Sequence, residues 1–300
     1  MSRFISGLSQ QQQLNFLLTN RIPRRLATQF MGWFSKIESR RLTRISLKLW
    51  GVFARDLNLS EARKQTFESL HDCFVRELKD GARNVDARPH IITSPCDAIV
   101  GSCGRIKEGT VFQAKGFPYA LSDLISDKRL QKKYHNGVYV TLRLTSTMYH
   151  RFHAPVDCQV KRVTYIAGDT WNVNPIALQR IEKLFCKNER AVIELKTANE
   201  ASNITLVPVA AILVASIKLH CLPENLDMKY AGPNQIDCQG RFRKGQEMGY
   251  FQHGSTIIVF ATDYHRLGDS IVTGERLQMG QALLQPHNPT PSPLKCNDEA

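Results

Sequence analysis

The stretch of sequence that decides the fold is residues 244–261, KGQEMGYFQHGSTIIVFA. Its first part is polar and contains regularly spaced glycines, whereas residues 257–260 are β-branched or apolar and predict a buried β-strand. The Gly254–Ser255 peptide bond therefore lies at a strand entrance. Glycine permits a strained or left-handed backbone, and strain beside a hydroxyl can favour attack of Ser255 Oγ on the preceding carbonyl. From these residues alone, a simple strand-opening turn is the commoner interpretation.

The same stretch resembles the processing site of phosphatidylserine decarboxylase proenzymes. That site has the pattern Lys-Gly-x-Glu-x-Gly-x-Phe, followed two residues later by Gly-Ser-Thr. The matching residues are Lys244, Gly245, Glu247, Gly249, Phe251, Gly254, Ser255 and Thr256. The resemblance implies that the chain cuts itself between Gly254 and Ser255 and that Ser255 becomes a covalent pyruvoyl cofactor. His253 replaces an aliphatic residue that is frequent in the family, a departure that bears on the cleavage rate.

Two histidines lie three residues apart in the segment 148–155, MYHRFHAP. Such histidines can be structural, can bind a metal or can act as acid–base groups. A metal is the weakest option because no third ligand and no His-Glu-x-x-His motif accompany them. The segment resembles the Asp-Tyr-His-Arg-x-His-x-Pro motif of the decarboxylases, with Met148 in place of the aspartate, and this resemblance favours a chemical role for His150 and His153.

An aspartate is the other candidate catalytic residue. Residues 94–98, SPCDA, resemble the Ser-Pro-Ala-Asp-Gly motif of the family, with Cys96 and Ala98 as departures. An isolated Asp97 at a strand start would more often cap a turn. With the family in view, Asp97 is expected to orient His153, and His153 to take the proton of Ser255 during self-cleavage. His150 is then the candidate that protonates the carbanion after decarboxylation, with Tyr149 as the runner-up.

Charge is concentrated in the first 55 residues, which hold ten basic residues and a single acid in a chain of net charge +13. Apolar residues recur there at helical spacing, first after Pro23 and again over residues 42–53. Ser9 and Gln12 form a candidate capping box for an earlier helix. Basic amphipathic helices of this kind suit the headgroup layer of an anionic membrane better than nucleic acid. An ordinary helical subdomain that packs on the core is the alternative.

Outside this region, the chain gives few signs of other architectures. The eight cysteines form no Cys-x-x-Cys pair and are interpreted as reduced thiols, although an even count does not exclude disulfides. The start has no signal-peptide pattern, and the most apolar run, residues 206–217, is interrupted by Pro208 and is too short to span a bilayer. Residues 286–300 are rich in proline and asparagine and are expected to be disordered.

The resemblance covers roughly residues 66–285 and implies a mainly β catalytic domain in an α+β protein. Three parts are expected: a basic helical membrane-associating region over residues 1–65, the catalytic domain over 66–285, and the tail over 286–300. The implied reaction converts phosphatidylserine to phosphatidylethanolamine and CO2 through a Schiff base on the pyruvoyl group, which acts as electron sink. The chains 1–254 and 255–300 are expected to stay together at the cytoplasmic face of the cell membrane as a peripheral protein, and a homo-oligomer is compatible with this expectation.

Two other functions remain open at this point. A Ser/His/Asp hydrolase acting on lipid would also use Ser255, but a nucleophile elbow requires Gly-x-Ser-x-Gly, whereas His253 and Ile257 flank this serine. A non-catalytic membrane-binding β protein would explain the basic helices but not the other motifs.

Overall fold

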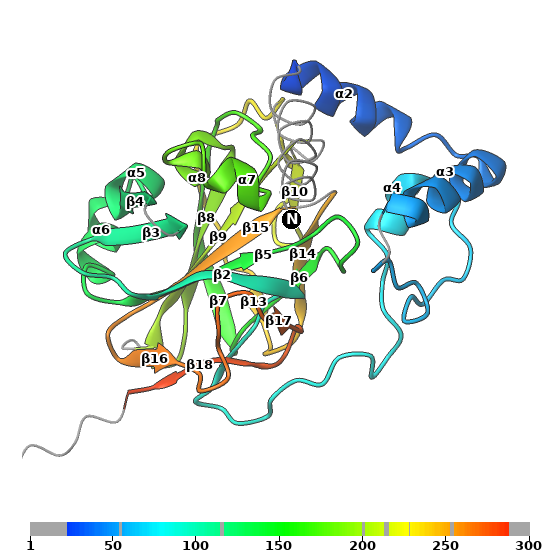
Figure 1. Ribbon diagram of the computed structural model, residues 1–300. Helices are drawn as coiled ribbons and strands as arrows, with labels where there is room; N and C mark the ends of the chain where they lie inside the picture. Colours follow the sequence, from blue (N-terminus) through cyan, green and yellow to red (C-terminus); the bar gives the residue numbers. More distant parts are fainter. Residues whose placement is uncertain are drawn as a thin grey trace, which may run out of the picture.

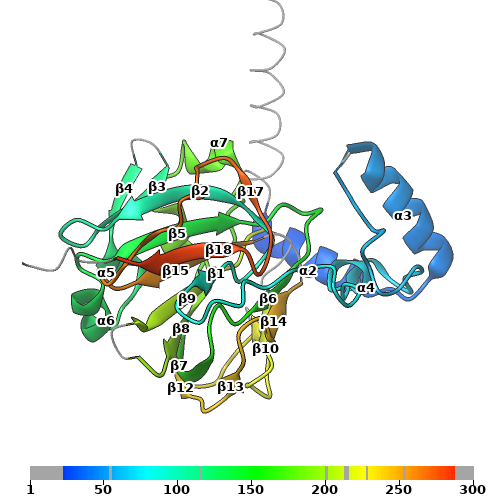
Figure 2. The ribbon, with the colours of Figure 1, turned by 90° about the horizontal axis from the view of Figure 1, so that it is seen from below.

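The computed structural model describes residues 23–53, 56–114, 117–199, 202–212, 216–227, 229–252 and 255–287. The helix expected near Ser9, the residues His253 and Gly254, and most of the expected tail lie outside these ranges. The described residues form a mainly β body, with three short helices of the N-terminal region, α2 to α4, gathered at one side of it (Figures 1 and 2). This arrangement confirms the expected fold class.

The largest sheet within the described residues has nine strands and the order β12-β7-β8-β9-β15-β5-β2-β17, with β13 also pairing with β7. All of its ladders are antiparallel. In chain order, its strands are β2 (Ala98–Arg105), β5 (Val138–Arg143), β7 (Cys158–Ile166), β8 (Arg190–Lys196), β9 (Ile204–Val209), β12 (Gln235–Asp237), β13 (Arg241–Phe242), β15 (Thr256–Ala261) and β17 (Arg276–Leu277).

Three smaller sheets complete the described β-structure. One has the order β11-β10-β14-β6, another β1-β18-β16, and β3 pairs with β4. Their strands are β1 (Ile92–Thr93), β3 (Thr110–Ala114), β4 (Phe117–Ala120), β6 (Arg151–His153), β10 (Ser216–Leu219), β11 (Leu226–Asp227), β14 (Glu247–Phe251), β16 (His265–Leu267) and β18 (Ala282–Pro286).

The strand predicted over residues 257–260 is confirmed as β15, which lies between β5 and β9 in the middle of the large sheet. All six of its residues are buried, because both faces of the sheet are covered. Ile257 and Val259 belong to a core shared with the sheet of β6, β10 and β14. Ile258 and Phe260 belong to a second core, closed by short helices. These are α5 (Leu121–Leu124), α6 (Lys128–Lys133), α7 (Pro175–Leu178) and α8 (Leu184–Lys187).

The N-terminal helices are α2 (Arg24–Phe34), α3 (Arg40–Phe53) and α4 (Leu70–Phe74). Helix α2 begins directly after Pro23, as predicted. Both α2 and α3 leave a stripe of large apolar side chains in solvent, here called the exposed apolar face; it consists of Leu26, Phe30, Trp33, Ile45, Leu49 and Val52. No helix in the described part of the chain combines the length and apolar character needed to cross a bilayer.

Candidate active site

The glycine-spaced stretch before Ser255 adopts its conformation for identifiable reasons. Gly245 has a φ of +78°, which favours glycine, and its N–H donates to the carbonyl of Ala154. Gly249 lies in β14, where a Cβ would come within 2.0 Å of the Lys218 carbonyl oxygen. Lys244 Nζ donates to the carbonyls of Arg88 and Ile91, 2.8 Å away in each case. The motif therefore fixes one tight turn and one close strand contact immediately upstream of the cleavage site.

Glu247, the acid of the same motif, connects it to the histidine segment. Its carboxylate accepts hydrogen bonds from Arg151 at 2.7 and 3.0 Å, and it pairs with Nε2 of His220 at 2.6 Å. Arg151 also donates to the carbonyl of Val75 at the end of α4. One partly buried arginine, Arg151, thus joins the N-terminal helices, the histidine segment and β14.

Ser255 is completely buried at the start of β15. Its hydroxyl oxygen makes no hydrogen bond with any residue that the structure describes, whereas its backbone carbonyl accepts from the N–H of Leu144 at 2.9 Å. A buried hydroxyl without a partner is unusual in a folded protein. It fits a residue that is to be converted, because formation of the pyruvoyl group removes this hydroxyl, and its loss breaks none of the hydrogen bonds described.

The segment from Leu144 to His153 lies against the cleavage site on both sides. Leu144 is hydrogen-bonded to Ser255, directly after the scissile bond, and the N–H of Phe251, shortly before it, donates to the carbonyl of His150 at 3.0 Å. Strand β6, which contains His153, pairs with β14. The fold therefore brings Ser255, His150 and His153 into one region.

His153 is buried, and both of its ring nitrogens are engaged. Nδ1 lies 2.8 Å from the carbonyl oxygen of Gly245. Because a carbonyl can only accept, Nδ1 carries the proton, and Nε2 accepts from the Tyr149 hydroxyl at 2.9 Å. Burial lowers the pKa of His153 below its usual value. The ring is therefore held as a neutral base with its lone pair directed at Tyr149.

His150 is also fully buried, but in different surroundings. Its ring packs against Phe74 of α4, with the centroids 4.9 Å apart. On the other side, Phe74 stacks on Trp50 of α3 at 5.0 Å. Because the segment is extended here, residues three apart point to opposite sides. The two histidines therefore occupy separate sites, and His150 is the one seen in contact with Phe74 of α4 among the described residues.

Asp97 is held by a buried arginine rather than by a histidine. Its carboxylate accepts from Nε of Arg83 at 2.9 Å and from its Nη2 at 2.5 Å, and from the N–H of Met279 at 2.9 Å. The expected hydrogen bond between Asp97 and His153 is not formed among the described residues, since both nitrogens of His153 have other partners. Asp97 does act on His153 electrostatically, in the direction that raises the pKa of the imidazole.

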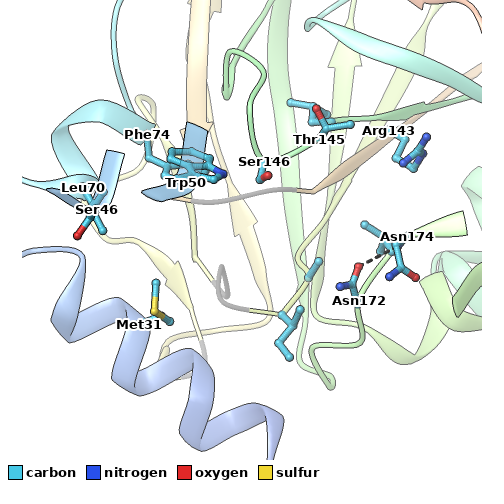
Figure 3. A pocket seen from close by; sticks show the side chains of 14 residues that line it. Met31, Ser46, Trp50, Leu70, Phe74, Arg143, Thr145, Ser146, Asn172 and Asn174 are labelled. Atoms are coloured by element: carbon cyan, nitrogen blue, oxygen red, sulfur yellow. Dashed lines mark hydrogen bonds between the residues drawn. The ribbon is translucent and has the colours of Figure 1, made fainter. Parts of the chain in front are cut away.

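A pocket of about 580 Å³ lies between the N-terminal helices and the end of β5. Figure 3 shows Met31, Trp50, Leu70 and Phe74 on one side of it, and Arg143, Thr145, Asn172 and Asn174 on the other. Its lining includes Leu144, whose N–H donates to the Ser255 carbonyl, and Phe74, whose ring contacts His150. The pocket therefore adjoins the candidate catalytic residues, and its labelled polar side chains are concentrated on the side of Arg143.

Four residues of this site were not identified from the sequence as site residues: Phe74, Arg83, Arg143 and Glu247. Signals for some of them existed. Arg143 is a lone charge that ends the apolar run 138–142, and Arg83 and Glu247 belong to motifs of the family. Their partners could not be inferred, because the contacts join segments distant in sequence.

A buried serine at a glycyl-serine bond, in one region with two buried histidines, fits the class of self-processing proenzymes. Comparison with known proteins gives the particular family. Residues 70–285 match the family model described as phosphatidylserine decarboxylase. The chain therefore belongs to the phosphatidylserine decarboxylase family, whose members carry a pyruvoyl group derived from serine and convert phosphatidylserine to phosphatidylethanolamine.

Full-length relatives agree with this result. The chain is 33% identical over 287 residues to the phosphatidylserine decarboxylase proenzyme of Haemophilus influenzae, an alignment that covers 91% of this chain and 96% of the relative. The proenzyme of Photobacterium profundum is 34% identical over 274 residues, covering 86% and 92%. That of Brevibacillus brevis is 31% identical over 271 residues, covering 89% and 95%. These comparisons favour a decarboxylase over both alternatives considered above.

Proposed function

We propose that two separate histidine sites serve the two reactions of this decarboxylase. His153, together with Asp97, serves the single self-cleavage at Gly254–Ser255. His150 serves the repeated decarboxylation of phosphatidylserine. The observation that carries this proposal is the separation of their surroundings: His153 is enclosed by Gly245 and Tyr149, whereas His150 contacts Phe74 on the pocket wall.

Self-cleavage begins when Ser255 Oγ attacks the carbonyl carbon of Gly254. A serine hydroxyl needs a base to remove its proton, and His153 is a neutral base at neutral pH because burial lowers its pKa. The C–N bond breaks to give an ester, loss of the Ser255 α-proton then breaks the Cβ–O bond, and the resulting dehydroalanine takes up water and releases ammonia. Tyr149 must release Nε2 for the first step. The described conformation is therefore that of a resting precursor.

In the decarboxylation, the pyruvoyl group at position 255 supplies the electron sink when CO2 leaves. The chain must then return a proton to the substrate carbon and exclude water from the site. His150 suits the first task because an imidazole nitrogen can carry a proton and deliver it to carbon as a general acid. Phe74 and Trp50 suit the second task, since their stacked rings close the side of His150 that faces the helices.

The two chains are proposed to remain associated after cleavage. Strand β15 belongs to the small chain but pairs over its whole length with β5 and β9 of the large chain. Strands β17 and β18 likewise pair with β2 and β1. Dissociation of the small chain would expose β15, a central strand whose residues are all buried. Cleavage therefore cuts a connection and leaves the core intact.

Residues 1–65 are proposed to dock the enzyme on an anionic membrane at the cytoplasmic face, with residues 66–285 as the catalytic part. Support comes from the exposed apolar face, in which Trp33 is 64% and Val52 68% exposed, and from the excess of basic residues around it. Apolar patches of this kind on a surface mark interaction sites. The pocket opens between the same helices and the sheet, so a lipid could pass from the bilayer to Ser255 without crossing water.

The assignment of the two histidines to different reactions is tested by measuring self-cleavage and decarboxylation on the same samples. His153→Ala and Asp97→Asn should accumulate folded precursor, whereas His150→Ala should be cut normally and release little CO2. Gel analysis of the chains and release of labelled CO2 provide the two readouts. Normal splitting of His153→Ala would show that another group is the base.

A further inference from the structure

Arg143 is a charged side chain at the end of an otherwise buried strand, β5. Within the described residues, its guanidinium makes no hydrogen bond and no ion pair, and its pKa is lowered by burial without an acidic neighbour to offset that effect. A partly buried charge is costly unless it has a partner. A lone arginine in such a position therefore indicates an anionic ligand that completes it.

The position of Arg143 relates it directly to the reacting residue. Its Cα pairs across the sheet with that of Thr256, which follows Ser255, and residues paired in this way project from the same face of a sheet. The next residue, Leu144, holds the carbonyl of Ser255. Arg143 and residue 255 therefore lie at the same end of the β5–β15 pair, one position apart along the strands.

The pocket around Arg143 has the polarity of a phospholipid. Arg143 is the one charged residue among those that line it in the described part of the chain. Thr145, Asn172 and Asn174 lie on its side of the pocket, and the aromatic and aliphatic side chains of the N-terminal helices lie on the other (Figure 3). The polar side fits a headgroup, and the apolar side fits acyl chains.

Phosphatidylserine offers two anions, and the chemistry distinguishes between them. A cation on the carboxylate would stabilise the ground state and would oppose the reaction, because the carboxylate loses its charge as CO2 forms. The phosphodiester keeps its charge throughout and lies only a few covalent bonds from the amine. A cation on the phosphodiester therefore anchors substrate and transition state alike.

We propose that Arg143 binds the phosphodiester of phosphatidylserine and so positions the serine headgroup at residue 255. The proposal rests on Ser255 as the reacting residue. An arginine is suited to this task because its planar guanidinium can form paired hydrogen bonds with two phosphate oxygens, which a lysine cannot.

The kinetic test uses neutral detergent micelles, so that the charge of the membrane surface plays no part. Arg143→Gln should still be cut into two chains. Its KM for phosphatidylserine should rise about 10- to 100-fold, the range for losing a hydrogen-bonded charge, with kcat nearly unchanged. Arg143→Lys should recover part of the loss. Arg162→Gln is the matched control, because Arg162 of β7 already forms an ion pair with Asp237 of β12 and does not line the pocket. This variant should behave as the wild type.

A substrate that lacks the phosphodiester shows which of the two anions of phosphatidylserine Arg143 binds. O-dodecyl serine keeps the amine and carboxylate of the headgroup but has an ether in place of the phosphodiester. Arg143→Gln and wild type should use it equally well. Equal losses on both substrates would place Arg143 at the carboxylate and would overturn the assignment, as would a fall in kcat with unchanged KM.

A binding measurement keeps the proposal testable if Arg143→Gln is not cut. In uncut Ser255→Ala protein, octyl phosphate should bind measurably by titration calorimetry and octanol more weakly. Adding Arg143→Gln should remove this difference. An unchanged affinity for octyl phosphate would refute the proposal. Absence of any decarboxylation by the wild type would instead contradict the assigned activity, a result distinct from a failure at Arg143.

Discussion

The Tyr149 hydroxyl lies 2.9 Å from Nε2 of His153 and occupies the lone pair that a base would use. The opposite nitrogen is fixed by the Gly245 carbonyl, whose residue belongs to the same motif as the cleavage site. The tautomer of the candidate base is thus set by the backbone of the segment that it is proposed to cut. This arrangement couples correct folding of residues 244–249 to the competence of His153.

The pH dependence of self-cleavage follows from the lowered pKa of His153. A lowered pKa means that the imidazole stays neutral, and hence basic, at and below the usual histidine value of about 6.5. The cleavage rate of refolded precursor should therefore be flat from about pH 8 to about 6.5 and should fall only at lower pH. The measurement is the rate of chain splitting on gels across this range. A midpoint above about 7 would contradict the role of His153.

Replacing His150 should separate the two reactions. His150→Ala should be cut at the wild-type rate, and its turnover of phosphatidylserine should fall about 10²- to 10⁴-fold, the usual effect of losing one positioned acid. Phe74→Leu keeps an apolar contact without the ring and should give a smaller loss of turnover. Labelled CO2 release measures both variants. Full activity of cleaved His150→Ala would exclude it as the proton donor.

Membrane binding should depend on the exposed apolar face and on salt. Phe30→Glu/Trp33→Glu should weaken binding to anionic vesicles, because it puts two charges where apolar side chains would enter the headgroup layer. Phe112→Glu is the matched control, since Phe112 is 43% exposed in β3, which lies on the opposite side of the body from α3 (Figure 1). Wild-type binding in vesicle sedimentation should also fall as salt is raised. Equal binding by the double variant and the control would rule out this docking surface.

His265 should make the fold sensitive to acid. This residue is buried, and burial lowers its pKa to about 4. Above about pH 6.5, both folded and unfolded forms are neutral. Below it, only the unfolded chain takes up the proton, so the free energy of unfolding falls as the pH drops from about 6.5 towards 4, by about 2 kcal/mol at pH 5. Urea unfolding of the Ser255→Ala precursor at pH 7 and 5 should show this loss. His265→Asn should reduce it, whereas exposed His90→Asn should not.

Local patterns predicted the elements near the cleavage site well. The apolar run after Thr256 is β15, and the helix after Pro23 is α2. Arg76, just after α4 (Leu70–Phe74), shows what local patterns miss, because its side chain turns inward and donates to the Thr147 carbonyl at 2.8 Å. No local sequence pattern indicates that a charged side chain will be buried against a backbone carbonyl that is distant in sequence.

The site was predictable to the extent that motifs carry it. Asp97, His150, His153 and Ser255 were all selected from the sequence, and the fold brings the two histidines and the serine together. The partners were not predictable. Arg83 rather than His153 holds the Asp97 carboxylate, and Tyr149 rather than Ser255 occupies Nε2 of His153. Such choices depend on tertiary geometry, since several groups of suitable chemistry compete for each hydrogen bond.

Self-cleavage is tested most directly by the intact mass of the purified wild-type protein beside Ser255→Ala. Two chains are expected for the wild type, residues 1–254 and residues 255–300. The smaller chain should differ from a serine-ended peptide by the loss of its amino group as ammonia, because its first residue is a pyruvoyl group. Ser255→Ala should remain a single chain. A folded wild-type protein that keeps its full-length mass, or a small chain that begins with an unmodified serine, would contradict the account.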